Sequence, residues 1–231
     1  MGKKSQNRTY YAEKLSASRL KKCYDLATPR ISQYLYEEIK FVLELIPENN
    51  HVLELGCGYG RIFASLLHKT HNITGIDNSF DNLIYGKSLY MEEPNIHWIH
   101  MDVSNIEFND NSFDIVLCIQ NGISAFKVDP ETLFHESIRI SKPGGRAIFS
   151  TYATSFWEHR LEWFKIQSAH GLIGEIDYKN TKMGKIVCED GFSSRTFSPQ
   201  EFKTIIKKMD NVIYKIAEVD SSSLFCVLTK K

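Results

Sequence analysis

The chain has 231 residues, a length that suits one α/β domain with a single core. Its 28 lysine and arginine residues balance 28 aspartate and glutamate residues, which disfavours a nucleic-acid partner because such binders usually carry a basic excess. Five cysteines without a Cys-x-x-Cys pair disfavour a disulfide framework and a zinc or iron–sulfur site. No apolar signal core opens the sequence and no stretch approaches the ~20 apolar residues of a membrane helix, so we expect a cytoplasmic protein.

The first 48 residues have a helical pattern. Two helices are predicted between Tyr11 and Ile46, divided where Thr28 supplies an N-cap and Pro29 a first-turn proline. The second helix is strongly amphipathic, so one of its faces should pack on the rest of the domain. We expect residues 1–48 to form a helical lid over a binding site.

Apolar strands then alternate with helices. Strands are predicted at 51–55, 72–77, 96–101, 113–119 and 144–152, and helices at 61–69, 80–90 and 130–141. This alternation indicates a mostly parallel sheet with helices on both faces. Residues 157–195 fall outside it, as a helix followed by short strands near 171–174 and 184–188, and are interpreted as an insert that faces the substrate.

The C-terminal part closes the sheet differently. A capping box from Ser198 to Glu201 opens another helix. Two apolar runs, 212–219 and 224–229, are separated by too few residues for a crossover helix, so they must pair antiparallel. The predicted core therefore comprises residues 49–156 and 196–231 of a single domain.

Three glycines in five residues, Gly56, Gly58 and Gly60, directly follow the first predicted strand. Glycine tolerates positive φ and lets the backbone approach a ligand closely. A dinucleotide-binding turn needs its third glycine five positions after the first, where this chain has Arg61. Glu54, just before the turn, would repel a pyrophosphate but would suit a cationic ligand.

This segment resembles the Glu/Asp-x-Gly-x-Gly-x-Gly motif of class I S-adenosylmethionine-dependent methyltransferases. Four further segments resemble motifs of that family in the same order, covering residues 50–152: Asp77-Asn78, the Asp102-Val103 pair after His100-Met101, Phe113-Asp114-Ile115-Val116, and Ser141-Lys-Pro-Gly-Gly145, where Ser141 replaces the usual leucine. The resemblance, closest to the small-molecule type 11/25 members, implies a Rossmann-like α/β fold. That fold has a seven-stranded, mostly parallel sheet with an antiparallel last strand beside the fifth.

The resemblance also implies a cofactor site. Asp77 would bind both ribose hydroxyls, because a carboxylate accepts two hydrogen bonds in a fork, and Asp102 would receive the adenine amino group. The plainer alternatives are a helix cap for Asp77 and a turn aspartate for Asp102. The full implied set for S-adenosylmethionine, or its product S-adenosylhomocysteine, is Tyr11, Glu54, Gly56, Cys57, Gly58, Gly60, Asp77, Asn78, Asp102, Val103, Ile119, Gln120 and Asn121, with no metal.

The implied reaction is direct in-line methyl transfer to a small-molecule acceptor, by a monomer or homodimer without nucleic-acid or membrane partners. Candidate general bases are His100, Tyr152 and His159. Aromatic residues that would line the pocket are Tyr10, Tyr11, Tyr24, Tyr59, Phe126, Tyr152, Trp157 and Trp163. Two alternatives stay open: a non-catalytic cofactor-binding module, and a methyltransferase for protein or RNA with a basic groove formed by Arg160, Lys165, Lys179, Lys182 and Lys185.

Overall fold

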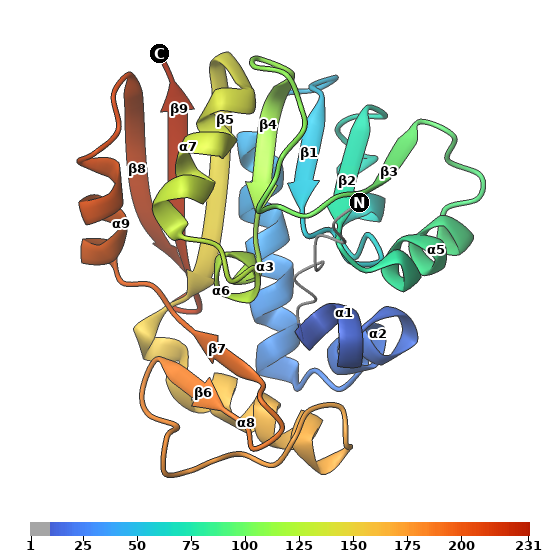
Figure 1. The fold of residues 1–231 in the computed structure, drawn as a ribbon, viewed down its shortest axis with the longest axis vertical. Helices are drawn as coiled ribbons and strands as arrows, with labels where there is room; N and C mark the ends of the chain where they lie inside the picture. The colour runs from blue at the N-terminus through green and yellow to red at the C-terminus, as the bar shows by residue number, and fades with distance from the viewer. Residues whose placement is uncertain (1–9) are drawn as a thin grey trace, which may run out of the picture.

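A seven-stranded sheet forms the centre of the computed structural model, which describes residues 10–231 (Figure 1). The first nine residues of the predicted lid lie outside the described residues. The strand order is β3-β2-β1-β4-β5-β9-β8, and β9 runs antiparallel to both neighbours while β1 to β5 are parallel. The strands are β1 Val52–Leu55, β2 Ile73–Asp77, β3 Ile96–His100, β4 Phe113–Cys118, β5 Ser141–Tyr152, β8 Val212–Val219 and β9 Ser223–Lys230. The predicted fold class is confirmed.

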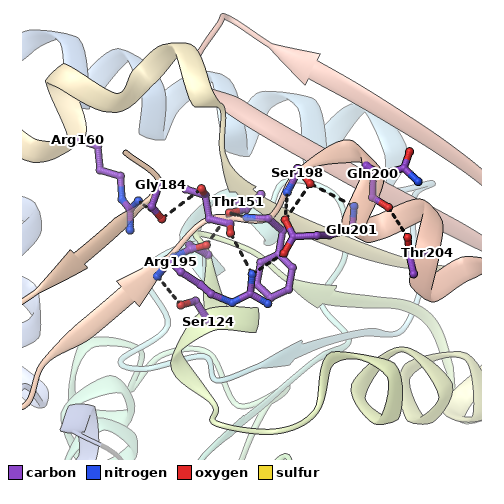
Figure 2. Close-up of polar contacts among 12 residues, drawn as sticks. Ser124, Thr151, Arg160, Gly184, Arg195, Ser198, Gln200, Glu201 and Thr204 are labelled. Atoms are coloured by element: carbon purple, nitrogen blue, oxygen red, sulfur yellow. Dashed lines mark hydrogen bonds and ion pairs between the residues drawn. The ribbon is translucent and has the colours of Figure 1, made fainter. Parts of the chain in front are cut away.

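Helices cover both faces of the sheet because successive strand residues alternate between two cores (Figure 1). Leu53, Val116 and Phe149 face α7 (Pro130–Ile140) and α9 (Pro199–Ile206). Val52, Leu117 and Ile148 face the second core, to which α3 (Pro29–Leu45), α4 (Phe63–Leu66) and α5 (Phe80–Leu89) contribute. The predicted capping box is confirmed at the start of α9, where Ser198 and Glu201 bond reciprocally (Figure 2).

A third core lies beyond the carboxyl ends of the parallel strands. It joins α1 (Tyr10–Lys14), α2 (Ala17–Asp25) and the first half of α3 to α8 (Trp157–Ala169) and the hairpin of β6 (Lys185–Val187) and β7 (Ser193–Arg195). The short elements η1 (Thr154–Phe156) and α6 (Gly122–Ala125) connect this layer to the sheet. The N-terminal helices and residues 157–195, distant in the sequence, thus pack together at one end of the domain (Figure 1).

Two predicted helices were wrong in extent. The helix expected at 61–69 is reduced to α4, because bonds such as Phe63 N to Gly60 O and His68 N to Ser65 O span three residues and make tight turns instead. The first N-terminal helix is broken in two at Ser16, an extended N-cap that is followed by Ala17 at φ 51°.

In the insert, residues 171–174 form no strand. Gly171 adopts a φ of 64°, and Leu172 N bonds back to Gln167 O, so this segment closes the end of α8. The predicted strand at 184–188 is present as the shorter β6, and its partner β7 was missed because Ser193 to Arg195 carry no apolar alternation.

Two glycines with the same backbone angle offer a matched stability test. Gly60 and Gly144 both have φ +77°, but a Cβ at Gly60 would lie 2.6 Å from the Trp98 ring, whereas nothing lies within 4 Å of a Cβ at Gly144. Gly144→Ala should cost about 1–2 kcal/mol of unfolding free energy from the left-handed backbone alone. Gly60→Ala should cost about 1–3 kcal/mol more through overpacking. Urea denaturation measures the loss of unfolding free energy in both variants. Equal losses would show that the Trp98 ring moves aside at no measurable cost.

Candidate functional site

A cavity lies at the carboxyl ends of the strands, between the sheet and the third core. Every residue of the implied cofactor set lines it except Gly60, whose missing Cβ makes room for Trp98 and Phe63. The cavity has two sides, because β2 and β3 lie on one flank of β1 and β5 lies on the other. The β1–β3 side carries the glycine turn (residues 56–60), Asp77 and Asp102; the β5 side carries Tyr152, Trp163, Phe164, Gln167, Ser193 and Ser194.

Asp77 holds the glycine turn in place. Its Oδ2 accepts a hydrogen bond from Gly58 N at 2.9 Å, and its Oδ1 accepts from Ser79 N at 2.8 Å and from Asn82 Nδ2 at 3.1 Å. Burial raises the pKa of Asp77, and these hydrogen bonds oppose the rise. Ser79, not Asp77, is the N-cap of α5, so the helix-cap alternative was wrong.

Asp102 both closes a local turn and lines the cavity. Its Oδ1 accepts a hydrogen bond from Ser104 N at 2.8 Å, which is the local turn that the plainer interpretation expected. The residue also lines the cavity together with Val103. A turn aspartate and a ligand-facing carboxylate are therefore compatible here.

Glu54 is a buried carboxylate with an unused oxygen. Its side chain lines the cavity, and Oε2 has no hydrogen-bond partner within residues 10–231. Burial raises the pKa of Glu54 to about 8, although the nearby Arg61 guanidinium lowers it. An orphaned buried oxygen facing a cavity fits a ligand that carries a positive charge or an N–H group.

This raised pKa gives the protein a specific pH dependence. Between an unfolded pKa of 4.5 and a folded value of about 8, the folded protein holds a proton that the unfolded chain has released. The free energy of unfolding should therefore fall as pH rises through this window. Urea denaturation from pH 5 to 8 measures this fall. The free energy of unfolding should fall less in Glu54→Gln, which cannot titrate, than in the wild type. The exposed control Glu48→Gln should show the same fall as the wild type. A parallel decline in wild type and Glu54→Gln would contradict the assignment.

The loop after β4 is strained and is held by an ion pair whose carboxylate is fully buried. Gln120 and Asn121 both have positive φ, 53° and 63°, which costs energy in residues other than glycine. Glu38 of α3, fully buried, accepts from Gln120 N at 2.9 Å and pairs with Arg61 Nη2 at 3.3 Å. The Arg61 guanidinium also lies 4.9 Å from the Tyr24 ring centre. This pair fixes the loop and the end of the glycine turn relative to each other.

Residues 52–145 match a methyltransferase domain. The ubiquinone biosynthesis O-methyltransferase of Hydrogenovibrio crunogenus is 30% identical over 138 residues, covering 58% of this chain and 56% of that protein. This part of the chain is therefore similar to known methyltransferases. The chain spans about half the length of the curated relatives that it matches.

Solved structures share this fold across nearly the whole chain. The PH0226 protein of Pyrococcus horikoshii has a TM-score of 0.65 at 20% identity, covering 90% of this chain and 94% of that one. The 1,6-didemethyltoxoflavin-N1-methyltransferase of Burkholderia thailandensis has a TM-score of 0.60 at 14% identity, covering 93% and 88% respectively. The structural similarity thus extends beyond residues 52–145, which match the methyltransferase domain in sequence.

On the β5 side of this cavity, polar side chains form a continuous network. Asn121 Oδ1 accepts from Thr151 Oγ1 at 2.6 Å, and Asn121 Nδ2 donates to Ser194 Oγ at 3.0 Å. Arg160 Nη2 donates to the same Ser194 oxygen at 2.9 Å. Asn121, expected to touch the cofactor, is therefore also a link between the loop after β4 and the insert.

The three candidate bases lie in different places. Tyr152 lines the cavity and its oxygen accepts from Gln120 Nε2 at 3.1 Å, but burial raises its pKa well above the ordinary value, so it stays protonated. His100 points away, with Nε2 3.1 Å from Asn78 O and its ring beside Phe80. His159 lies in a separate surface hollow on α8. Neither histidine lines the cavity of the candidate site.

Most of the expected aromatic lining is present. Tyr11, Tyr24, Tyr59, Phe126, Tyr152 and Trp163 line the cavity, whereas Tyr10 and Trp157 do not. All five cysteines are buried and unbridged, and burial raises the pKa of each thiol. Within residues 10–231 no group of three or more histidine, cysteine, aspartate or glutamate side chains is arranged to hold a metal ion. Over the same range, each helix is too short or too polar to traverse a bilayer.

Sequence reasoning missed Glu38, the pairing role of Arg61, and Ser193 and Ser194 of β7. The position of Glu38 in the sequence could have indicated its burial, because it lies on the apolar face of the amphipathic α3 between Leu35 and Val42. The two serines have no such indication, since their strand has no apolar alternation.

Proposed function

We propose that this protein transfers a methyl group from S-adenosylmethionine to a small-molecule acceptor. The observation that carries the proposal is the shared cavity, in which the family's cofactor positions on the β1–β3 side face an enclosed, largely aromatic wall on the β5 side. We call that wall the acceptor side. The names of the Hydrogenovibrio and Burkholderia enzymes, which methylate small molecules, support this class of acceptor.

The residues present fit the cofactor. In this proposal Asp77 binds the ribose hydroxyls, Asp102 the adenine amino group, and the free Oε2 of Glu54 the amino group of the methionine part. Positive φ at Gly56 and Gly58 leaves bare backbone at the cavity wall. When bound, S-adenosylmethionine would supply an electrophilic methyl group on sulfur.

The protein would contribute positioning and exclusion of water. The loop of Gln120 and Asn121, fixed by Glu38, would orient the acceptor against the donor side of the cavity. Residues 10–25 and the insert 157–195 would close the cavity from solvent. None of the candidate bases is both deprotonated and at the cavity, so the acceptor would bring a nucleophile that needs no proton removal by a side chain.

Arg160 argues against the macromolecule-directed alternative. That alternative needs a surface groove containing Arg160, but this side chain is fully buried. Lys165, another member of the expected groove, lies against the Tyr178 ring at 5.6 Å. A groove for protein or RNA would have to form without its central residue.

Calorimetry tests the cofactor part of the proposal. Titration of the purified protein with S-adenosylhomocysteine should give one site per chain with a dissociation constant in the micromolar range. Radiolabelled S-adenosylmethionine, incubated with a panel of small aromatic acceptors, should then transfer label to a small molecule and not to added RNA or protein. An absence of S-adenosylhomocysteine binding would overturn the proposed function.

A further inference from the structure

Among the described residues, the buried cation Arg160 has no carboxylate partner. The side chain has no exposed area, and within residues 10–231 no carboxylate lies at ion-pair distance from it. Its Nη2 donates to the carbonyl oxygen of Ser194 at 3.0 Å and to its hydroxyl at 2.9 Å, while Nε has no partner. The guanidinium lies 4.6 Å from the Tyr152 ring centre. A buried cation of this kind is costly unless an anion approaches it.

The hydroxyl of Ser194 is forced to donate toward the cavity. A serine oxygen has two lone pairs and one hydrogen. Both lone pairs are taken, by Arg160 Nη2 and by Asn121 Nδ2, whose orientation is fixed by the Thr151 hydroxyl on Asn121 Oδ1. The Ser194 proton therefore needs an acceptor, and the described residues provide none, although Ser194 lines the cavity. The donor is also polarised by the guanidinium behind it.

The charge around the cavity is unequally distributed. The charged side chains that line it, Glu54, Arg61, Asp77 and Asp102, belong to the β1–β3 side, and the acceptor side is lined by aromatic rings, Gln167 and the two serines of β7. A neighbouring surface hollow shares Ser124, Ser193 and Ser194 with the cavity and adds Lys127 and Lys185. Arg195, also in that hollow, is neutralised by Glu201 at 2.8 Å (Figure 2). Among the described residues, the acceptor side therefore has no lining carboxylate, and the Arg160 guanidinium lies directly behind Ser194.

We infer that the methyl acceptor is a small aromatic acid, whose carboxylate accepts a hydrogen bond from the Ser194 hydroxyl and is attracted by the buried Arg160 guanidinium. The aromatic walls accommodate a planar ring, and the polarised hydroxyl accounts for the carboxylate. Arg160 acts here as a positioning residue through Ser194, and Ser194 makes the contact. This inference rests on the proposed function, because it assigns the acceptor of the same cavity.

Three matched probes test it: benzoate, benzamide and benzylamine, titrated by ligand-observed NMR with and without saturating S-adenosylhomocysteine. Benzoate should bind at least tenfold more tightly than benzamide, and benzylamine most weakly. Ser194→Ala should reduce the preference for benzoate to less than threefold while leaving the S-adenosylhomocysteine affinity unchanged. The control Ser193→Ala removes a neighbouring hydroxyl that Arg160 does not contact and should keep the preference.

Arg160→Lys provides a second readout, since it retains the charge in the same place and should preserve part of the preference. Equal binding of benzoate and benzamide by the wild type, or a full preference in Ser194→Ala, would overturn the inference. Because the titrations are also run without S-adenosylhomocysteine, failure of cofactor binding would refute the proposed function separately from the anion preference.

Discussion

Asp77→Ala is expected to weaken S-adenosylhomocysteine binding by about 1–3 kcal/mol, or roughly 5- to 150-fold in dissociation constant. The carboxylate holds Gly58 N, Ser79 N and Asn82 Nδ2, so its removal releases the turn as well as the contact proposed for the ribose. Calorimetry at constant pH measures the change. Asp81→Ala, an exposed aspartate in the first turn of the adjoining α5, should leave the affinity unaltered. An Asp77→Ala protein with wild-type affinity would place the ribose elsewhere.

Glu38→Gln is expected to lower the free energy of unfolding by about 3 kcal/mol, because it leaves the largely buried Arg61 cation without its partner. Urea denaturation followed by circular dichroism measures the loss. The matched control is Glu37→Gln, one residue away, which removes only the exposed pair with Lys40 and should change stability by less than about 0.5 kcal/mol.

A double replacement shows whether the stability loss comes from the uncompensated Arg61 charge or from the missing hydrogen bond to Gln120. If the cost comes from an uncompensated charge, Glu38→Gln combined with Arg61→Met should be more stable than Glu38→Gln alone. An additive loss in the double variant would instead mean that the hydrogen bond from Glu38 to Gln120 N carries the effect.

The parts of the molecule predicted from sequence are those governed by local pattern. Short apolar runs predicted the strands, and the three glycines with Asp77 predicted the position of the cavity, because these residues act over short stretches of chain. The extents of α4 and of the first helix were wrong, since three-residue hydrogen bonds and a positive φ at Ala17 override helical propensity there.

The contacts that sequence could not give join distant segments. Glu38 meets Gln120, and Arg160 meets Ser194, only after the lid and insert have packed on the sheet. No spacing rule connects such positions. The same limit applies to the candidate bases, because a histidine near a motif in sequence, such as His100, can still point away from the cavity in the folded chain.

The position of α2 couples the two ligands. Leu20 packs over Gly58, Tyr24 borders the acceptor side, and Ala17 N bonds to Asn82 Oδ1 at 2.6 Å, so one helix covers both parts of the cavity. Trp163 Nε1 donates to Cys23 O at 3.0 Å and ties this helix to α8. An outward movement of α2 would open both parts of the cavity at once, so closure of that helix over the first molecule also completes the wall around the second. Donor and acceptor should therefore bind with positive cooperativity, and neither should leave without displacing the same helix.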